Sequence, residues 1–410
     1  MRTLLNRFLE YVKIDTQSDE NSTSSPSTAK QLDLSRLLEK ECRLLGLHDV
    51  SCDERGVVKA TIPGTFLENT PTILWNAHID TSPEYSGKNV KPIVHSNYDG
   101  REIILPGDPT KVIRLEENSS LSSLKGTTII TSDGTTLLGA DDKAGIAVIM
   151  TAAEFLQSHP DILHGPIKIC FTVDEEIGRG LEGLDVAQFQ AVCAYTLDGG
   201  GLGMIETETF SADLAIITVK GVNAHPSEAK EKGMINALKI LAKLICLLPV
   251  DRLAPERVEG REGFIHPYTF EGGVASASVR ILLRDFKTEM LGNYAQMLRE
   301  IVDRLHLEYP GASIDLEIKK QYRNMGEGLK NEPRAVSYAL DAMKALGIKP
   351  IVKAIRGGTD GAHMTEKGLP CPNLFCGQHN LHSPLEWVSL FEMEKSVEML
   401  VELAKRWAVP

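Results

Sequence analysis

The sequence GADDKAG, residues 139–145, places two adjacent carboxylates between small residues, directly before the apolar run 146–150. This pattern predicts a loop that opens a buried helix over 143–157. Because negative charge is costly to bury without a cation, a metal ion is the simplest compensation. An Asp-Asp pair taken alone is more often a solvated helix cap. Other motifs in the chain must therefore decide between the two interpretations.

Several predicted strands end in ionisable side chains. They are strand 72–77 with His78 and Asp80, strand 166–173 with Asp174, Glu175 and Glu176, and strand 192–197 with Asp198. Side chains alternate along a strand, so His78 and Asp80 face the same side and can act on one centre. Ligands of open α/β sheets bind outside the carboxyl ends of the strands. We therefore expect these groups at one edge of a buried sheet.

These groups suit two divalent metal ions that share a bridging carboxylate. The candidates are His78, Asp80, Asp141, Asp142, Glu175, Glu176, Asp198 and His382. Imidazole together with oxygen ligands favours zinc, and manganese or cobalt would also fit. A metal pair lowers the pKa of a bridging water and polarises a carbonyl group. The sequence therefore predicts metal-assisted hydrolysis.

The order of predicted elements divides the chain into two domains. Residues 1–210 and 323–410 predict an α/β domain with a mixed, mostly parallel sheet and helices on both faces. Residues 211–322 follow the β-α-β-β-α-β order of a ferredoxin-like domain, inserted into the first. Residues 81–126, which are polar and rich in Gly, Pro and Asn, predict a long surface excursion with short strand-like pieces such as 102–105. Loops of that length are usually functional.

The composition, with 42% hydrophobic and 24% charged residues among 410, is that of an ordinary folded protein. The formal net charge of -12 repels phosphate backbones, so we expect no nucleic-acid partner. No apolar run predicts a membrane span, and MRTLLNRFLEYVK at the start predicts an amphipathic helix instead of a signal peptide. Seven cysteines without C-x-x-C spacing favour buried thiols in a reducing compartment. We expect a cytoplasmic protein.

Eight segments carry a resemblance to a known family. They are NAHIDTSP (76–83), SGKNV (86–90), TLLGADDKAGIA (136–147), FTVDEEIG (171–178), YTLDGGG (195–201), NAHP (223–226), IRGGTDGA (355–362) and LPCPNLF (369–375). Over essentially its entire length the chain resembles the aminotripeptidase branch of the M20 zinc metallopeptidases. The resemblance implies a hydrolase that releases the N-terminal residue, preferentially from tripeptides.

The resemblance also implies two zinc sites with one shared ligand. Their ligands are His78, Asp141 and Asp198 for one zinc, and Asp141, Glu176 and His382 for the other. It implies that Glu175 is the general base, which takes a proton from the bridging water and passes it to the leaving amine. Asp80 would orient His78, and Asp142 would shape the turn without binding metal.

Members of the family bind their peptide between the catalytic and the inserted domain. The resemblance suggests His225 and Arg284 from the inserted domain, and Arg356 from the first, as substrate contacts. A guanidinium group pairs with a carboxylate in a two-pronged fork, so an arginine at a fixed distance from the metals would measure peptide length. Ordinary salt bridging is the alternative for all three. Analogy also suggests a homodimer formed through the inserted domain.

One region departs from the family pattern. Where we expect a Tyr-Asn-Tyr-His run, the chain has His379, Asn380, Leu381 and His382. His382 aligns with the metal ligand, and His379 is a rival within reach, so substrate preference near this loop stays open. The alternative functions are another M20-type hydrolase, namely a dipeptidase, a carboxypeptidase or an N-acyl-amino-acid amidohydrolase, and a binding protein that has lost catalysis. The excursion with SGKNV favours the tripeptidase, and the presence of Glu175 with every ligand argues against lost catalysis.

Overall fold

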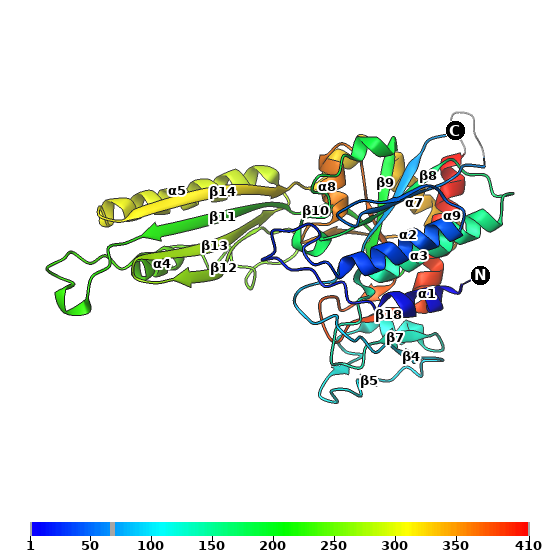
Figure 1. Cartoon of the computed structure of the whole chain (residues 1–410), viewed down its shortest axis with the longest axis horizontal. Coiled ribbons are helices and arrows are strands. Elements are labelled where there is room, and N and C mark those ends of the chain that lie inside the picture. Colours follow the sequence, from blue (N-terminus) through cyan, green and yellow to red (C-terminus); the bar gives the residue numbers. More distant parts are fainter. Residues whose placement is uncertain (1, 66–69, 409–410) are drawn as a thin grey trace. The chain divides into compact units, whose positions relative to one another are not determined.

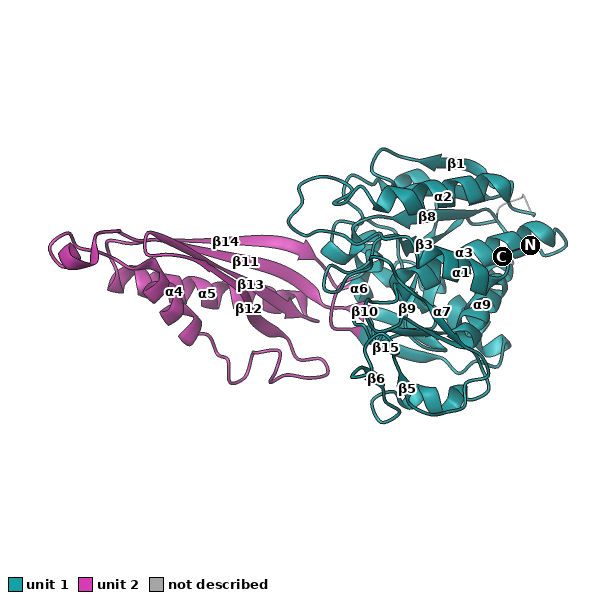
Figure 2. Ribbon diagram, turned by 60° about the horizontal axis from the view of Figure 1, so that its bottom comes forward, with its two compact units in different colours: residues 1–207, 325–354, 359–410 teal, residues 208–324, 355–358 magenta. Residues whose placement is uncertain are grey.

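The computed structural model describes residues 2–65 and 70–408. These residues form two compact units, coloured separately in Figure 2. Unit 1 comprises 1–207, 325–354 and 359–410, and unit 2 comprises 208–324 and 355–358. Arg356 was expected in the first domain, and the structure places it in unit 2 because 355–358 contact that unit.

Unit 1 is built on an eight-stranded sheet of order β1-β2-β8-β3-β9-β16-β10-β15. Its strands β8, β9 and β10 are labelled in Figure 1. The strands are β1 His48–Cys52, β2 Val58–Ile62, β3 Ile73–His78, β8 Ile167–Thr172, β9 Cys193–Gly199, β10 Met204–Thr209, β15 Ile351–Ile355 and β16 Asn373–Phe375. The neighbours β8, β3, β9 and β16 run parallel, whereas β1, β2 and β10 pair antiparallel. The predicted mixed sheet is confirmed, and its parallel pairings lie between the central strands β8, β3, β9 and β16.

Helices cover this sheet. They are α1 Leu4–Tyr11, α2 Gln31–Leu44, α3 Ala140–Ser158, α6 Met325–Leu329, α7 Arg334–Ala345, α8 Asp360–Glu366 and α9 Leu390–Ala408. All residues of β3 are buried, and since its side chains alternate between the faces, both faces of the sheet are covered there. Asp141 and Asp142 have non-helical dihedral angles, so the continuous helix within α3 begins at Lys143, where the sequence predicted it. Its apolar run 146–150 is fully buried.

The excursion 81–126 is more ordered than its polar composition predicted. It contains β4 Ile93–His95, β5 Ile103–Ile104, β6 Val112–Ile113 and the 3-10 helix η1 Ser119–Leu124. A second sheet of order β17-β18-β7-β4 joins it to β7 Ile129–Thr131, β17 Gln378–His379 and β18 Trp387–Ser389. Tyr98, Leu105, Leu121 and Trp387 belong to a separate small core. The excursion is therefore a packed layer against the segment that carries His382.

Unit 2 has a four-stranded antiparallel sheet of order β12-β13-β11-β14. Its elements are β11 Ser211–Lys220, α4 Ala237–Cys246, β12 Phe264–Gly272, β13 Ser276–Asp285, α5 Thr288–Glu308 and β14 Ser313–Tyr322. Leu241 of α4 and Leu298 of α5 share one hydrophobic core with Ile217 and Ile281 of the sheet. The helices therefore bury their apolar faces against this sheet, in the β-α-β-β-α-β order of the ferredoxin-like pattern.

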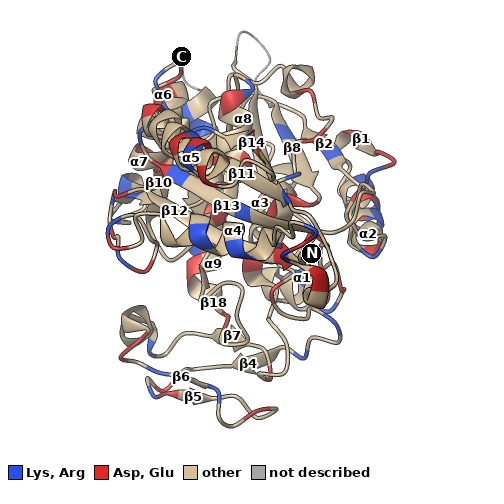
Figure 3. Cartoon of the chain, turned by 90° about the vertical axis from the view of Figure 1, so that its left-hand side faces the viewer, with Lys and Arg blue, Asp and Glu red and all other residues tan. Residues whose placement is uncertain are grey.

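Acidic and basic residues both occur along α2, for example Asp33 in its first turn and Arg43 in its last, as the red and blue segments of this helix show in Figure 3. Within residues 2–65 and 70–408, no helix is both long and apolar enough to cross a membrane.

Gly145 lies where α3 passes β9, and an alanine there is expected to destabilise the protein. An added Cβ would overlap the carbonyl oxygen of Leu197 and a carboxylate oxygen of Asp142. Since overpacking of a dense core costs about 1–3 kcal/mol, we expect Gly145→Ala to lower the free energy of unfolding by at least that amount. Urea unfolding measures it.

The matched control is Gly292→Ala in α5, where an added Cβ meets nothing within 4 Å. Alanine is the better helix former, so this variant should gain up to about 1 kcal/mol. Equal effects of the two substitutions would contradict the close approach at Gly145.

Candidate metal centre

The carboxyl ends of three parallel strands meet at one edge of the unit 1 sheet (Figure 2). His78 ends β3, Glu175 and Glu176 begin the 3-10 helix η2 (Glu175–Ile177) after β8, and Asp198 lies near the end of β9. Asp141 enters from the start of α3. The expected convergence of ionisable groups from distant parts of the sequence is therefore present in the fold.

His78, Asp141 and Asp198 form one group with the spacing of metal ligands, and their ligand atoms lie within 4.8 Å of one another. The His78 Nε2 atom is 3.0 Å from Asp141 Oδ1 and 3.8 Å from Asp198 Oδ1. His78 is 2% exposed, and Asp141 is 7% exposed.

Asp141, Glu176 and His382 form a second such group. The His382 Nε2 atom is 2.8 Å from Glu176 Oε2 and 3.3 Å from Asp141 Oδ2. Asp141 thus turns Oδ1 toward His78 and Oδ2 toward His382. This is the arrangement of a carboxylate that bridges two metal ions.

An orphaned polar atom shows that this site suits a cation. Glu176 Oε1 is buried and has no hydrogen-bond partner among the described residues. A buried carboxylate oxygen without a partner is costly unless a cation or donor meets it. The donor set, two imidazoles with carboxylate oxygens, is one that zinc, manganese or cobalt accepts. The residues present therefore fit a pair of divalent metal ions.

Burial and mutual repulsion raise the pKa values of several carboxyl groups in this cluster. Burial and the neighbouring Asp141 carboxylate raise the pKa of Glu176 to about 8 and that of Asp198 to about 6. Burial also raises the pKa of Glu175 well above its usual value, with the Asp198 carboxylate adding to the effect. Burial opposes the charge on His78, but the carboxylates of Asp141, Asp198 and Asp80 outweigh it and raise the pKa of this imidazole. The cluster therefore brings together more carboxyl groups than its two histidines can pair with, and the raised pKa values favour the neutral forms of Glu175 and Glu176.

Asp80 holds the backbone of the acidic pair. Its Oδ1 accepts the N–H of Glu175 at 2.9 Å, and its Oδ2 accepts the N–H of Glu176 at 3.2 Å. His78 Nδ1 lies 3.0 Å from the backbone oxygen of Asp80 and 3.5 Å from its Oδ1. Asp80 therefore contacts His78 mainly through its carbonyl group, while its carboxylate orients the segment that carries Glu175 and Glu176.

Asp142 and Asp174 lie outside both ligand groups and hold turns in place. Asp142 accepts the N–H groups of His78 at 3.2 Å and Gly145 at 3.1 Å. Asp174 accepts the N–H of Ser27 at 2.7 Å and the side-chain amide of Gln31 at 2.6 Å. Within the acidic run 174–176, Asp174 thus bonds to the N-terminal segment, whereas Glu175 and Glu176 face the centre.

His379 does not join either ligand group. Its Nε2 lies 2.7 Å from Glu392 Oε2, and its ring stacks on Trp387 with centroids 3.8 Å apart. Of the two rival histidines, the structure brings His382 to Asp141 and leaves His379 in a packing role.

Three buried residues that the sequence interpretation missed support the ligands. Gln378 donates to the carbonyl and Oδ1 of Asp198, both at 3.0 Å, and Asn373 accepts the N–H of Asp198 at 3.1 Å. Glu386 accepts the N–H of Asp141 at 2.9 Å. Burial raises the pKa of Glu386 to about 7. Polar residues inside the apolar stretches 371–378 and 385–388 were the available signal.

The three expected substrate contacts all belong to unit 2. His225 is exposed, with Nδ1 2.7 Å from Ser227 Oγ. Arg284 Nη1 donates to the carbonyl of Asp213 at 3.2 Å. Arg356 Nη1 donates to the carbonyl of Gly260 at 2.7 Å, and its guanidinium lies 5.1 Å from the Phe210 ring.

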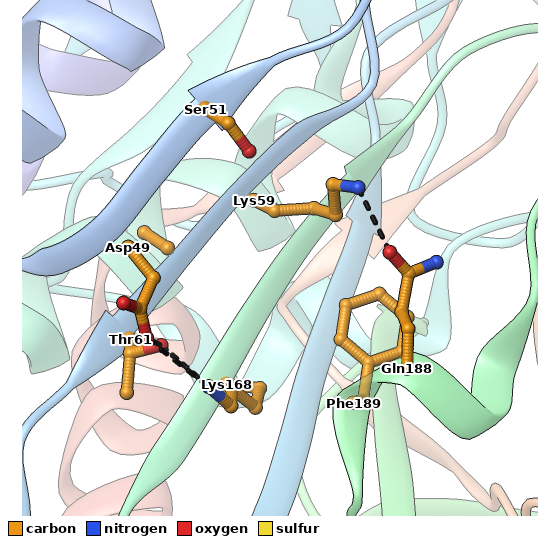
Figure 4. Close-up of a pocket in the computed structure, with 8 residues that line it drawn as sticks. Asp49, Ser51, Lys59, Thr61, Lys168, Gln188 and Phe189 are labelled. Atoms are coloured by element: carbon orange, nitrogen blue, oxygen red, sulfur yellow. Dashed lines mark hydrogen bonds and ion pairs between the residues drawn. The ribbon is translucent and has the colours of Figure 1, made fainter.

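A separate pocket lies over β1, β2 and β8, and it contains none of the predicted site residues (Figure 4). Its lysines already have partners. Lys59 Nζ is 3.0 Å from Gln188 Oε1, and Lys168 Nζ is 2.9 Å from Thr61 Oγ1 and 3.3 Å from Asp49 Oδ2.

Comparisons with known proteins agree with this geometry. The model of peptidase family M20/M25/M40 matches residues 132–406. A protein of Bacillus subtilis named peptidase T is 46% identical over 404 residues, which are 98% of both chains. A peptidase T of Clostridium botulinum is 44% identical over 408 residues, which are 100% of both chains.

Structural comparison gives the same result. The crystal structure of the aminopeptidase PepT from Bacillus cereus is 26% identical, with a TM-score of 0.74 over 99% of this chain and 98% of that one. The chain therefore belongs to peptidase family M20/M25/M40 and is a peptidase.

Proposed function

We propose that this peptidase is a metal-dependent aminopeptidase that releases the N-terminal residue from tripeptides. The observation that carries the proposal is the sharing of Asp141 between two ligand groups at one sheet edge. The names of its full-length relatives and the aminopeptidase PepT of Bacillus cereus support the reaction class. The preference for tripeptides rests on the resemblance of the motifs.

Two zinc ions per subunit are the proposed cofactors, with manganese or cobalt as alternatives. His78, Asp141 and Asp198 would hold one ion, and Asp141, Glu176 and His382 the other. When bound, the ions would lower the pKa of a water molecule between them and polarise the carbonyl group of the scissile peptide bond.

Glu175 is the proposed general base. It belongs to neither ligand group, yet its Oε2 lies 4.0 Å from His78 Nε2, beside the ligands. Asp80 accepts the backbone N–H of Glu175, as described above, and so fixes the segment from which this carboxylate extends. Glu175 would take a proton from the attacking water and deliver it to the leaving amine. Asp80 would act as the residue that orients both His78 and Glu175.

His225, Arg284 and Arg356 are proposed substrate contacts. Arg356 and Arg284 are each held by backbone carbonyl groups, which limits the positions that their side chains adopt. A guanidinium carries five N–H donors, so these bonds leave donors for the carboxylate of a peptide. Such an arginine would select peptides by length.

The remaining proposals concern the setting of the enzyme. Unit 1 would be the discontinuous catalytic domain, and unit 2, which includes 355–358, a lid or dimerisation domain that pairs two chains. All seven cysteines are free thiols, which supports a reducing, cytoplasmic location.

Metal removal tests the function directly. We expect a chelator to abolish hydrolysis of tripeptides with a free N-terminus, and Zn²⁺ to restore it, because the ligand groups alone cannot polarise the peptide carbonyl. Metal analysis should give two ions per chain. The assay should compare di-, tri- and tetrapeptides, each with free and blocked N-termini.

Cleavage of blocked substrates without cleavage of free tripeptides would refute the aminotripeptidase and favour another hydrolase of the family. Full activity of protein that analysis shows to be metal-free would refute the metal centre itself.

A further inference from the structure

Glu386 accepts three backbone hydrogen bonds from the loop that leads to α3. Its Oε2 accepts the N–H groups of Leu138 and Gly139, both at 2.7 Å, and its Oε1 accepts that of Asp141 at 2.9 Å. The residue is 1% exposed. Bonds to both oxygens fix the plane of the carboxylate, and the carboxylate in turn fixes the three donors.

The loop needs this acceptor because of its conformation. Gly139 has a φ of 80°, and Asp141 and Asp142 depart from helical dihedral angles, so the N–H groups there have no intrahelical partner. Buried N–H groups without acceptors are costly and rare. Glu386 satisfies three of them at once, including the N–H of the residue that belongs to both ligand groups.

Glu386 also lies four residues after His382, on the same short segment. Directly after it, Trp387 of β18 pairs with Thr131 of β7. The backbone of Glu386 is therefore anchored beside the start of the loop that it holds. One carboxylate thus ties the segment that carries His382 to the loop that carries Asp141.

We propose that Glu386 is a positioning residue that sets the separation of Asp141 and His382, and thereby the affinity of the centre for metal. The inference rests on the proposed function, since it takes Asp141 and His382 as ligands. According to this inference, metal binding also depends on Glu386, a residue that contacts neither metal nor substrate.

Glu386→Gln is the first test. Glutamine keeps the size of the side chain but places an NH₂ group against N–H donors, so at least one loop bond is lost. We expect Zn²⁺ affinity to fall about 10- to 100-fold, the range for groups that orient metal ligands. Calorimetric titration of the metal-free full-length chain with Zn²⁺, well below its unfolding temperature, measures this. Glu386→Asp keeps the charge but has a shorter side chain, so it should also lower the affinity for Zn²⁺.

Glu41→Gln is the matched control. Glu41 is a second buried glutamate, 6% exposed, which accepts from Arg7 at 2.7 Å and from Tyr11 at 2.6 Å. Its loss should lower the unfolding temperature without changing Zn²⁺ affinity, because these partners lie outside both ligand groups.

The outcomes separate the inference from the function on which it rests. Wild-type protein that binds no Zn²⁺ would refute the proposed metal centre. Wild-type protein that binds two ions, with both Glu386 variants binding as tightly, would overturn the role of Glu386 alone. If neither variant folded, Glu386 would be a requirement of the fold, and the positioning proposal would likewise be overturned.

Discussion

Replacing Glu175 with alanine is expected to leave both metal ions bound while lowering kcat about 10²–10⁴-fold, the usual contribution of a general acid–base group. The reason is its place in the site. Glu175 belongs to neither ligand group, but its carboxylate lies beside His78 and its backbone is held by Asp80. Removal of the side chain would delete the proposed proton carrier and leave both ligand groups complete.

Metal analysis and tripeptide kinetics on the same preparation test this prediction. The control is Glu182→Ala, which removes an exposed carboxylate that pairs with Arg179 at the surface. Such pairs contribute little, so its kcat and metal content should match the wild type. Undiminished turnover by Glu175→Ala would exclude its role as the base, and loss of metal would show that it is a ligand instead.

The strands and the strand-end groups were predictable because the underlying signals are local. Strands β3, β8 and β9 are mostly apolar, and ionisable residues lie at their carboxyl ends or directly after them. Parallel strands place such ends at one edge of the sheet. The interruption of α3 at Asp141 and Asp142 was also visible in sequence, as charge directly before a buried run. These features depend on neighbours in the chain, which a sequence displays.

Features that depend on distant partners were not predictable. The excursion was expected to run over the surface with short strand-like pieces, but its apolar side chains pack with Trp387, which lies far away in sequence. The bonds of Glu386 to Leu138 and Gly139 join residues almost 250 positions apart. Arg356 was placed in the first domain because its neighbours on both sides belong there, and only tertiary contacts assign 355–358 to unit 2.

The choice between His379 and His382 shows the same limit within a single motif. Both residues are imidazoles on one segment, and sequence spacing permits either as ligand. The structure separates them through partners that sequence does not reveal, since Glu392 and Trp387 hold His379 while Glu176 and Asp141 meet His382.

Replacing Asp141 with alanine should abolish binding of both metal ions, whereas Asp198→Ala should weaken only one of the two sites. The contrast follows from the geometry. Asp141 turns Oδ1 to His78 and Oδ2 to His382, so its loss removes a ligand from each group, while Asp198 belongs to the first group only. Activity of the Asp141 variant should fall to that of the metal-depleted protein.

Calorimetric titration with Zn²⁺ measures how many ions each variant binds. A general loss of stability would not by itself give different numbers of bound ions in the two variants. Asp185→Asn, which changes an exposed aspartate at the start of the 3-10 helix Val186–Phe189, is the control and should bind two ions. An Asp141 variant that still binds one ion tightly would show that the two sites do not depend on a common bridge. Loss of both ions from Asp198→Ala as well would show instead that occupation of one site requires the other. Asp141 and Asp198 lie at the same sheet edge and share the neighbour His78, but only Asp141 of the two also contacts His382. A difference in the number of ions that the two variants bind therefore tests whether Asp141 bridges the two sites.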